Sequence, residues 1–194
     1  MNESAVRCFL AAPLPDHLAE PLNDAVDVLR LQGQTRRVRW VPERNWHLTL
    51  AFLGDQSPAW IGQLHQALQA SPLLPPGSDV IALQSRWISG FPDAKSRIVA
   101  LEFHPQPALV ALKAQLDLRL QTLGWTPDPR RFRPHVTLGR VQRDHTVHIR
   151  PLLCELVWPV AQITLYQSTL GPGGSEYQAL WSVPVQSALD HVSC

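Results

Sequence analysis

Apolar and polar residues alternate over Trp46–Gly54, a pattern typical of a half-buried β-strand that ends at a glycine. Successive side chains of a strand point to opposite faces. The predicted buried face holds Leu48, Leu50 and Phe52, and the open face holds His47, Thr49 and Ala51. The open face therefore carries an imidazole beside a hydroxyl. A single His-x-Thr of this kind is most often ordinary polar surface.

The same pattern recurs at Pro134–Arg140, close to half a chain length further on. In this second copy Val136 and Leu138 point inward, and His135 and Thr137 point outward. A small residue follows the threonine on the open face of both copies, Ala51 in one and Gly139 in the other. We expect these small residues to keep the floor of a cleft open. Two histidines on matching strands of two similar halves indicate an acid and a base that face each other.

The rest of the chain alternates between strand and helix patterns. Strands are predicted at Val6–Ala12, Val80–Ile88 and Arg97–Phe103, with a hairpin of Ile163–Leu170 and Glu176–Val185 around Gly171–Gly174. Helices are predicted at His17–Leu31, from the Ser57-Pro58 start to Ala70, and over Leu109, Leu112, Leu116 and Leu120 to Gly124. Arg36–Pro42 is predicted to be extended and Ser71–Ser78 a linker. Each half of the chain supplies strands and helices, so we expect an α+β fold of two lobes of mainly antiparallel sheet with outer helices. Periodicity alone does not give the arrangement of the lobes. We expect one bilobal domain over residues 1–186 and a loose tail over residues 187–194.

Composition narrows the class of protein further. A chain of 194 residues can bury one sizeable core, and no apolar run approaches the ~20 residues of a membrane helix. The start of the chain lacks the build of a signal peptide, and Cys8, Cys154 and Cys194 fit neither a disulfide framework nor a zinc site. We therefore expect a reduced, cytoplasmic protein. The net charge of +1 argues against a broad basic face for long nucleic acid. Arginines nevertheless precede both motifs, where they could form a positive rim: Arg36, Arg37, Arg39, Arg130, Arg131 and Arg133.

Other chemical candidates are weaker. His145 and His148 lack nearby partners for a metal site, so a solvated loop is favoured. Gly171–Gly174 lacks the Lys-Ser/Thr of a phosphate-binding loop and is predicted to be a turn. Three aromatic residues could stack a base, although packing is the favoured role for each: Trp40, Trp46 and Phe91.

The paired motifs His47–Leu50 and His135–Leu138 resemble those of the 2H phosphoesterase superfamily. Within it the chain is similar to the bacterial and archaeal RNA 2',3'-cyclic phosphodiesterases, also called 2'-5' RNA ligases. Further segments that resemble the family are Arg7–Ala11, Phe52–Gly54, Arg133–His135, Leu165–Ser168, and Gly171–Gly174 with Tyr177. The resemblance covers Arg7 to Val185. It implies a bilobal, pseudo-twofold fold with the active-site cleft between the lobes.

Opening a 2',3'-cyclic phosphate requires an activated water and a proton for the leaving sugar oxygen. Histidine, with an ordinary pKa of ~6.5, can fill either role, and threonine hydroxyls can donate to the phosphate oxygens. The resemblance implies His47 as general acid and His135 as general base, whereas the residues alone leave the roles open. Arg133 or Arg140 could assist the phosphate, and Arg140 could equally be a strand-end charge paired with an acid. No metal and no cofactor are expected.

The expected partners are RNA with 2',3'-cyclic phosphate ends or small cyclic nucleotides. The protein is expected to be a monomer and not to bind a membrane. Two hypotheses remain at this stage. The first is a metal-independent phosphodiesterase, in which 2'-5' ligation could use the same site. The second is a non-catalytic nucleotide- or RNA-binding module of the same fold. Intact pairs in both motifs favour the enzyme, because a binding module has no need of two histidines.

Overall fold

The computed structural model describes residues 4–75, 78, 80–93, 96–142, 145, 148–171 and 174–186. The helices are α1 (Asp16–Arg30), α2 (Pro58–Gln69) and α3 (Pro107–Thr122), with 3-10 turns at Gly33–Arg37 and Glu43–Asn45. The strands are β1 (Val6–Pro13), β2 (Val38–Trp40), β3 (His47–Gln56), β4 (Ala82–Phe91), β5 (Ile98–Phe103), β6 (His135–Val141), β7 (Leu152–Leu153), β8 (Val157–Pro159), β9 (Gln162–Gly171) and β10 (Gly174–Pro184).

The strands form an antiparallel sheet in the order β10-β9-β1-β3-β6-β5-β4-β7, with β2 beside β6 and β8 beside β4. We call β10, β9, β1 and β3 the first lobe, and β6, β5, β4 and β7 with β2 and β8 the second lobe. The lobes join where β3 pairs with β6, at Leu48 opposite Val136. The predicted α+β, mainly antiparallel fold is confirmed, and its two sheets are continuous through this pair.

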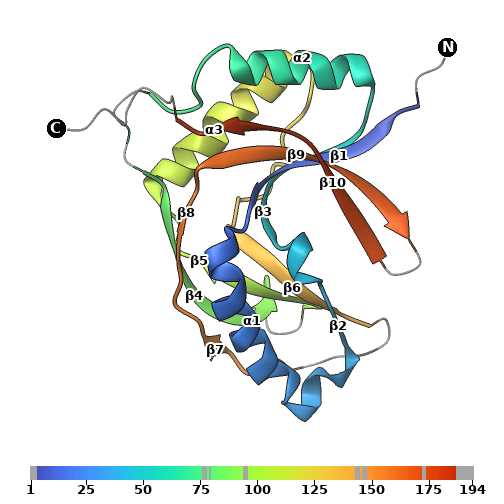
Figure 1. Ribbon diagram of the computed structural model, residues 1–194, viewed down its shortest axis with the longest axis vertical. Coiled ribbons are helices and arrows are strands. Elements are labelled where there is room, and N and C mark those ends of the chain that lie inside the picture. The colour runs from blue at the N-terminus through green and yellow to red at the C-terminus, as the bar shows by residue number, and fades with distance from the viewer. Residues whose placement is uncertain are drawn as a thin grey trace.

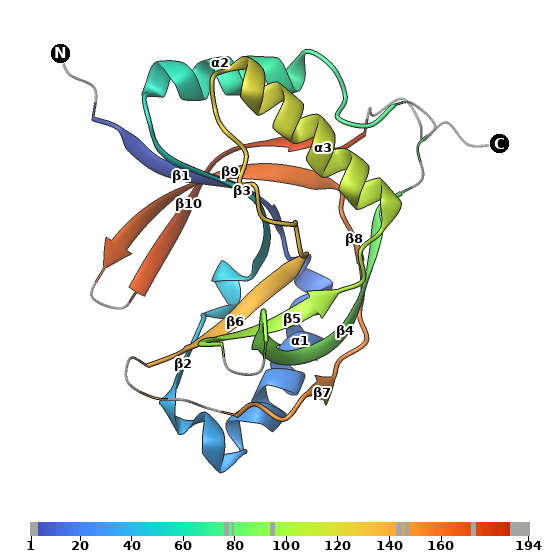
Figure 2. The ribbon, with the colours of Figure 1, turned by 180° about the vertical axis from the view of Figure 1, so that it is seen from behind.

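Each outer helix covers one lobe. Figures 1 and 2 show α2 and α3 side by side over the first lobe, and α1 against the second. The indole Nε1 of Trp60 in α2 donates to the Leu123 carbonyl after α3, at 2.8 Å. His65 of α2 stacks on Trp181 of β10, with ring centres 4.7 Å apart. Each of two helices therefore crosses to the other lobe. β1 belongs to the first lobe and the helix after it, α1, covers the second; β5 belongs to the second lobe and the helix after it, α3, covers the first.

The helix periodicity is confirmed in detail. The residues that α1 and α3 bury are those the spacing predicts: Leu18, Leu22, Val26 and Leu29, and Leu109, Leu112, Leu116 and Leu120. Ser57 caps α2 by accepting a hydrogen bond from the Trp60 backbone N–H at 3.2 Å. None of the helices in the described part of the chain is long and apolar enough to span a membrane.

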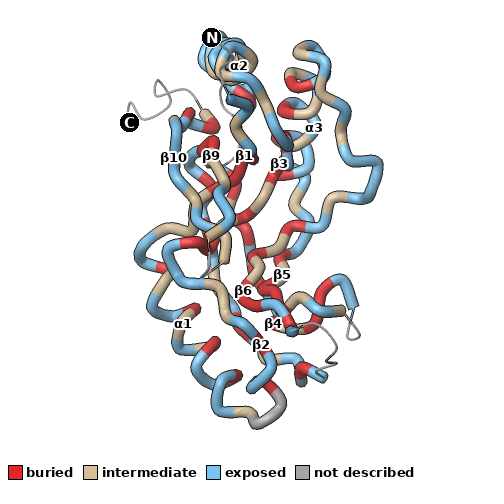
Figure 3. Tube along the Cα trace, turned by 90° about the vertical axis from the view of Figure 1, so that its right-hand side faces the viewer, coloured by how far each residue is buried: buried red, intermediate tan, exposed pale blue. Residues whose placement is uncertain are grey.

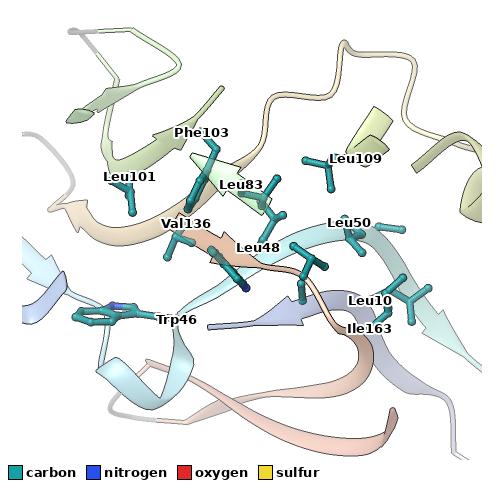
Figure 4. Close-up of a cluster of buried hydrophobic side chains, with 14 of the residues drawn as sticks. Leu10, Trp46, Leu48, Leu50, Leu83, Leu101, Phe103, Leu109, Val136 and Ile163 are labelled. Atoms are coloured by element: carbon teal, nitrogen blue, oxygen red, sulfur yellow. The ribbon is translucent and has the colours of Figure 1, made fainter. Parts of the chain in front are cut away.

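One hydrophobic core runs through both lobes. Figure 3 shows buried residues concentrated along the centre of the molecule, where β3, β6 and β5 lie. In Figure 4 the side chain of Leu48 lies near Val136, across the joint between the lobes, and Leu50 lies further along β3. Leu48 and Val136 are fully buried. The back of the central strands therefore fixes the two lobes to each other, and their open face is left for the candidate site.

The prediction that Phe52 is buried and Ala51 open is wrong, because β3 contains a bulge. Leu10 of β1 pairs with Ala51, and Ala11 pairs with Thr49, so that Leu50 is an extra residue in the strand. A bulge reverses the alternation of the side chains beyond it. Phe52 is accordingly 72% exposed, and Ala51 is buried.

The second motif strand carries the same bulge. Val99 of β5 pairs with Gly139 and Ala100 pairs with Thr137, which leaves Leu138 as the extra residue. Both strands consequently begin with the same sequence of burial classes along the chain. Arg140 is exposed at the position that matches Phe52. The two halves are thus related in backbone detail as well as in motif.

Gly139 has a different role from the predicted one of keeping the cleft floor open. A Cβ at this position would lie 2.5 Å from Cγ1 of Val38 and 3.2 Å from Cε3 of Trp40. The glycine therefore allows β2 to lie close against β6. The small residues next to the motif threonines are Ala11 and Ala100 on the neighbouring strands.

Further differences concern loops and edges. Gly33–Arg37 is a 3-10 turn, so only the later part of the predicted extended approach is a strand. The strands β7 and β8 were not predicted, because they are too short for an alternation of apolar and polar residues to be recognised in the sequence. Cys8 and Cys154 are free and buried. The predicted tail at 187–194 lies outside the described residues.

Candidate active site

The two motifs meet at the centre of the sheet. His47 is the first residue of β3 and His135 the first of β6. Leu48 pairs with Val136 in an antiparallel register. Each motif's histidine is therefore next to the threonine of the other motif across the two strands. The histidines and threonines of both motifs are half-buried, on the face opposite the core residues. The structure thus brings all the predicted motif side chains together.

Both histidines are held by the same backbone contact. His47 Nδ1 lies 2.6 Å from the Asn45 carbonyl oxygen, and His135 Nδ1 lies 2.9 Å from the Arg133 carbonyl oxygen. A carbonyl can only accept, so each Nδ1 carries the hydrogen and donates it. In the neutral ring the proton-accepting nitrogen is then Nε2. Each half of the molecule therefore offers an Nε2 that can take or give a proton.

His47 lies in an aromatic pocket of the first lobe. Its ring centre is 4.9 Å from that of Phe9 and 5.3 Å from that of Tyr177. Burial lowers the pKa of His47 to about 4; the carbonyl of Asn45 opposes this shift, and the charges of His135 and Arg140 add to it. The Asn45 side chain donates to the Ser175 carbonyl at 3.0 Å, which fixes the segment that orients the ring.

His135 has a more polar setting in the second lobe. Its ring stacks on Phe91 with 3.9 Å between centres. Burial lowers its pKa as well, whereas the Arg133 carbonyl and the carboxylate of Glu102 raise it. Glu102 lies directly opposite His135 in the β5–β6 pairing. A nearby carboxylate favours the protonated ring, so a proton shared between the histidines resides more readily on His135 than on His47 in the free protein.

The threonines are placed to meet a ligand. Thr49 and Thr137 lie opposite Ala11 and Ala100, whose small side chains leave the hydroxyls uncovered. Within the described ranges, neither hydroxyl has a protein hydrogen-bond partner. Half-buried hydroxyl donors on one face with two histidines suit an anion with several oxygens.

The two candidate arginines differ. Arg133 donates to the Pro92 carbonyl at 2.9 Å and pairs with Glu102 at 2.6 Å, so its charge is already engaged. Arg140 is exposed, and its charge lowers the pKa of both histidines. Its cross-strand neighbour is Arg39 of β2. No ion pair is found for Arg39 or Arg140 among the described residues, so the alternative of a strand-end charge paired with an acid is not seen. Like charges opposite each other cost stability, and an anion would relieve this cost.

The aromatic candidates from the sequence make packing contacts, and the two remaining histidines are exposed. Trp46 is buried and its indole donates to the Val41 carbonyl at 3.2 Å. Trp40 lies beneath the Arg30 guanidinium, and Phe91 packs on His135. His145 and His148 are exposed. In the part of the chain that the structure describes, no group of three or more His, Cys, Asp or Glu residues is placed to hold a metal ion.

Sequence reasoning missed several residues of the site. Asn45 and Glu102 act on the histidines through a carbonyl and a carboxylate, and Phe9 and Tyr177 enclose His47. The signal for Asn45 was local, since it lies two residues before the histidine, as Arg133 does in the second copy. The other contacts depend on strand pairing, which the sequence does not display.

An antiparallel sheet with one His-x-Thr strand from each lobe at its centre is the arrangement of a 2H phosphoesterase. Comparisons with known proteins agree with this class. The sequence model of the 2'-5' RNA ligase superfamily matches residues 14–171. The chain belongs to this superfamily.

Curated relatives and solved structures cover nearly the whole chain. The RNA 2',3'-cyclic phosphodiesterase of Escherichia coli (strain K12) is 31% identical over 176 residues, which span 90% of this chain and 93% of that protein. The RNA 2',3'-cyclic phosphodiesterase of Methanothermobacter thermautotrophicus is 26% identical over 183 residues, 89% of this chain and 95% of that protein. A Thermus thermophilus structure has a TM-score of 0.76 at 24% identity, over 92% of this chain and 97% of its own. E. coli LigT complexed with 3'-AMP has a TM-score of 0.73 at 24% identity, over 94% of this chain and 99% of its own. At these identities the two structures show that the fold is shared.

Proposed function

We propose that this protein hydrolyses RNA 2',3'-cyclic phosphate ends to 2'-phosphomonoesters, without a metal, by general acid and base catalysis from His47 and His135. The observation that supports this most directly is the matched pair of Nδ1 contacts, which leaves an Nε2 for proton transfer in each half. The names of the curated relatives point to the same substrate class. We take the protein to act as a monomer in the cytoplasm.

In the proposed reaction a water attacks phosphorus while His135 takes its proton. The bond from phosphorus to O3' breaks, and His47 gives a proton to O3', which leaves a 2'-phosphate and a 3'-hydroxyl. His135 gains a proton and His47 loses one, so His135 must release a proton to solvent and His47 must take one up before the next turnover. Thr49 and Thr137 donate to the non-bridging oxygens, whose charge grows in the transition state. Arg140 supplies a positive charge near both rings.

The low pKa of His47 bears on which ring is the acid. An acid must be protonated before the reaction, and the free protein holds His47 neutral. His47 can act as the acid because the bound phosphate anion favours its protonated form. If His135 is the acid instead, the carboxylate of Glu102 already favours its protonated form against the effect of burial. Replacement of the 3' oxygen by sulfur, a better leaving group, should restore activity only to the variant that lacks the acid.

The central experiment is single-turnover hydrolysis of an RNA that ends in a 2',3'-cyclic phosphate, with the product terminus identified. Alanine at His47 or His135 should reduce kcat by about 10²–10⁴-fold, the usual contribution of general acid–base catalysis. Alanine at Thr49 or Thr137 should cost less, about 1.5–3 kcal/mol in kcat/KM, since a hydrogen bond to a charged group is lost. Wild-type rates from either folded histidine variant would refute the two-histidine mechanism, and a wild-type protein without turnover would favour the non-catalytic binding module.

Metal independence has its own test. Activity should survive extensive chelation with EDTA, because the proposed proton transfers and charge stabilisation use side chains alone. Complete loss that a divalent ion restores would replace the two-histidine mechanism by a metal-assisted one. The superfamily name also includes ligation. In ligation a 5'-hydroxyl would take the place of water as the nucleophile, and the same bond from phosphorus to O3' would break. The same assay, run with a 2',3'-cyclic phosphate end and a 5'-hydroxyl RNA, measures the 2'-5' joined product.

A further inference from the structure

A groove crosses the second lobe on the side of His135. Two hollows of about 540 Å³ and about 550 Å³ share Ser89, Glu102 and Pro151, so they form one continuous groove. Glu102 is the cross-strand partner of His135 and lines both hollows, which places the part of the groove where they meet beside the candidate active site. Each hollow lies within the range of volumes, about 300–1,000 Å³, that pockets for small ligands occupy. The groove therefore has room for more than the reacting phosphate.

One end of the groove carries an exposed arginine and tryptophan side by side. Ser85 and Ile88 of β4 pair with Phe103 and Leu101 of β5, which leaves an extra residue between them. This bulge brings both Arg86 and Trp87 to the surface, although they are adjacent in a strand. Trp87 is 37% exposed, and the Arg86 guanidinium lies 5.8 Å from the centre of its ring. A ring and a guanidinium so placed can contact a base and a phosphate together.

Charges of both signs line the groove, with arginines at Arg86 and Arg150 and carboxylates at Glu102 and Asp93. Glu102, at its floor, is neutralised by its ion pair with Arg133. Arg150 and His148 line the other hollow, the one without Arg86 and Trp87, and are exposed. Among the residues the structure describes, neither Arg86 nor Arg150 forms an ion pair. Basic side chains along a groove with an aromatic ring at its surface are the features of proteins that bind single-stranded nucleic acid.

We propose that this groove binds the RNA strand on the 5' side of the cyclic phosphate end. Trp87 stacks on a base, and Arg86 and Arg150 contact backbone phosphates. This inference rests on the proposed function, since it assumes that the terminal phosphate occupies the histidine pair. A cyclic mononucleotide lacks the upstream strand and does not use the groove. The groove thus makes the protein act on RNA ends in preference to free cyclic nucleotides.

The test compares two substrates, a 2',3'-cyclic mononucleotide and a hexaribonucleotide that ends in a 2',3'-cyclic phosphate. Trp87→Ala should raise KM for the hexaribonucleotide by about fivefold or more, the lower end of the loss of a stacked base, and leave the mononucleotide unchanged. Arg86→Ala and Arg150→Ala should each reduce the slope of log kcat/KM against log salt by about 0.7 for the hexaribonucleotide. Arg30→Ala is the matched control, because it removes an exposed arginine of α1 that does not line the groove.

Each outcome decides the matter. An unchanged hexaribonucleotide KM in the Trp87 variant overturns the proposal, and so does an equal loss on both substrates. If the wild-type protein turns over neither substrate, the proposed function fails, and the groove is then tested by binding alone. Fluorescence anisotropy of a labelled hexaribonucleotide with a 2'-phosphate end should show weaker binding by Trp87→Ala than by Arg30→Ala. Equal binding by these two variants overturns the proposal independently of any activity.

Discussion

Burial of His47 should make the folded protein less stable as the pH falls from neutral. Its pKa is about 4 in the folded protein, where desolvation disfavours the charged ring, against ~6.5 in an unfolded chain. Between these values the unfolded chain binds a proton that the folded protein does not, so acid favours unfolding. The stability that neutral His47 contributes is complete above pH ~6.5 and is lost as the pH falls toward 4.

The size of the effect follows from the difference between the two pKa values. One pKa unit corresponds to ~1.4 kcal/mol, so the full loss is about 3 kcal/mol, reached below pH ~4. At pH 5 the loss is already about 2 kcal/mol. This is a large fraction of the ~5–15 kcal/mol by which native proteins are stable. The lowered pKa of His135 adds a loss in the same direction.

Urea unfolding at pH 7 and at pH 5 measures this loss. The wild-type protein should lose about 2 kcal/mol more than His47→Gln between the two conditions, because the variant has no ring to protonate. The carboxylates titrate in both proteins, so the difference isolates His47. His145→Gln removes an exposed histidine and should behave as the wild type does. Equal losses in the wild type and in His47→Gln would refute the reasoning.

Three further predictions use the same protein. Leu138→Ala removes a fully buried side chain and should lower the free energy of unfolding by ~2–5 kcal/mol in urea titrations; a change below ~1 kcal/mol would contradict the core described above. Gly139→Ala should cost ~1–3 kcal/mol in the same assay, because its Cβ would lie 2.5 Å from Cγ1 of Val38, and an unaffected variant would show that β2 can move away. In the free protein both histidine pKa values lie below the ordinary one, so kcat/KM should fall with increasing pH above ~6.5; a plateau extending to pH 8 would count against a shared proton.

The structural features that follow from regular patterns along the chain could be predicted from the sequence. The leucines of α3 repeat over several turns, so their burial follows from periodicity alone. The duplicated His-x-Thr likewise places each histidine and threonine on one face, because only two positions separate them. These short-range relations do not depend on which strand lies alongside.

The remaining features depend on neighbours that the sequence does not display. Leu50 and Leu138 are extra residues only with respect to β1 and β5, so the reversal that exposes Phe52 and Arg140 appears only once the strands pair. Nor does the sequence show that Glu102 lies opposite His135. Both the bulges and this pairing set the chemistry of the site, which explains why the roles of the arginines could not be settled in advance.

The exchange of helices between the lobes has a consequence for how the chain can be divided. The first lobe needs β9 and β10 from the end of the chain and α3 from its middle, while the second lobe needs α1 from the beginning. A polypeptide cut between the two motif strands therefore yields two pieces, neither of which can bury its own sheet. Such pieces should be unfolded apart and should reassemble when mixed, as a split protein does. During synthesis, the native core can close only when the last hairpin has been made.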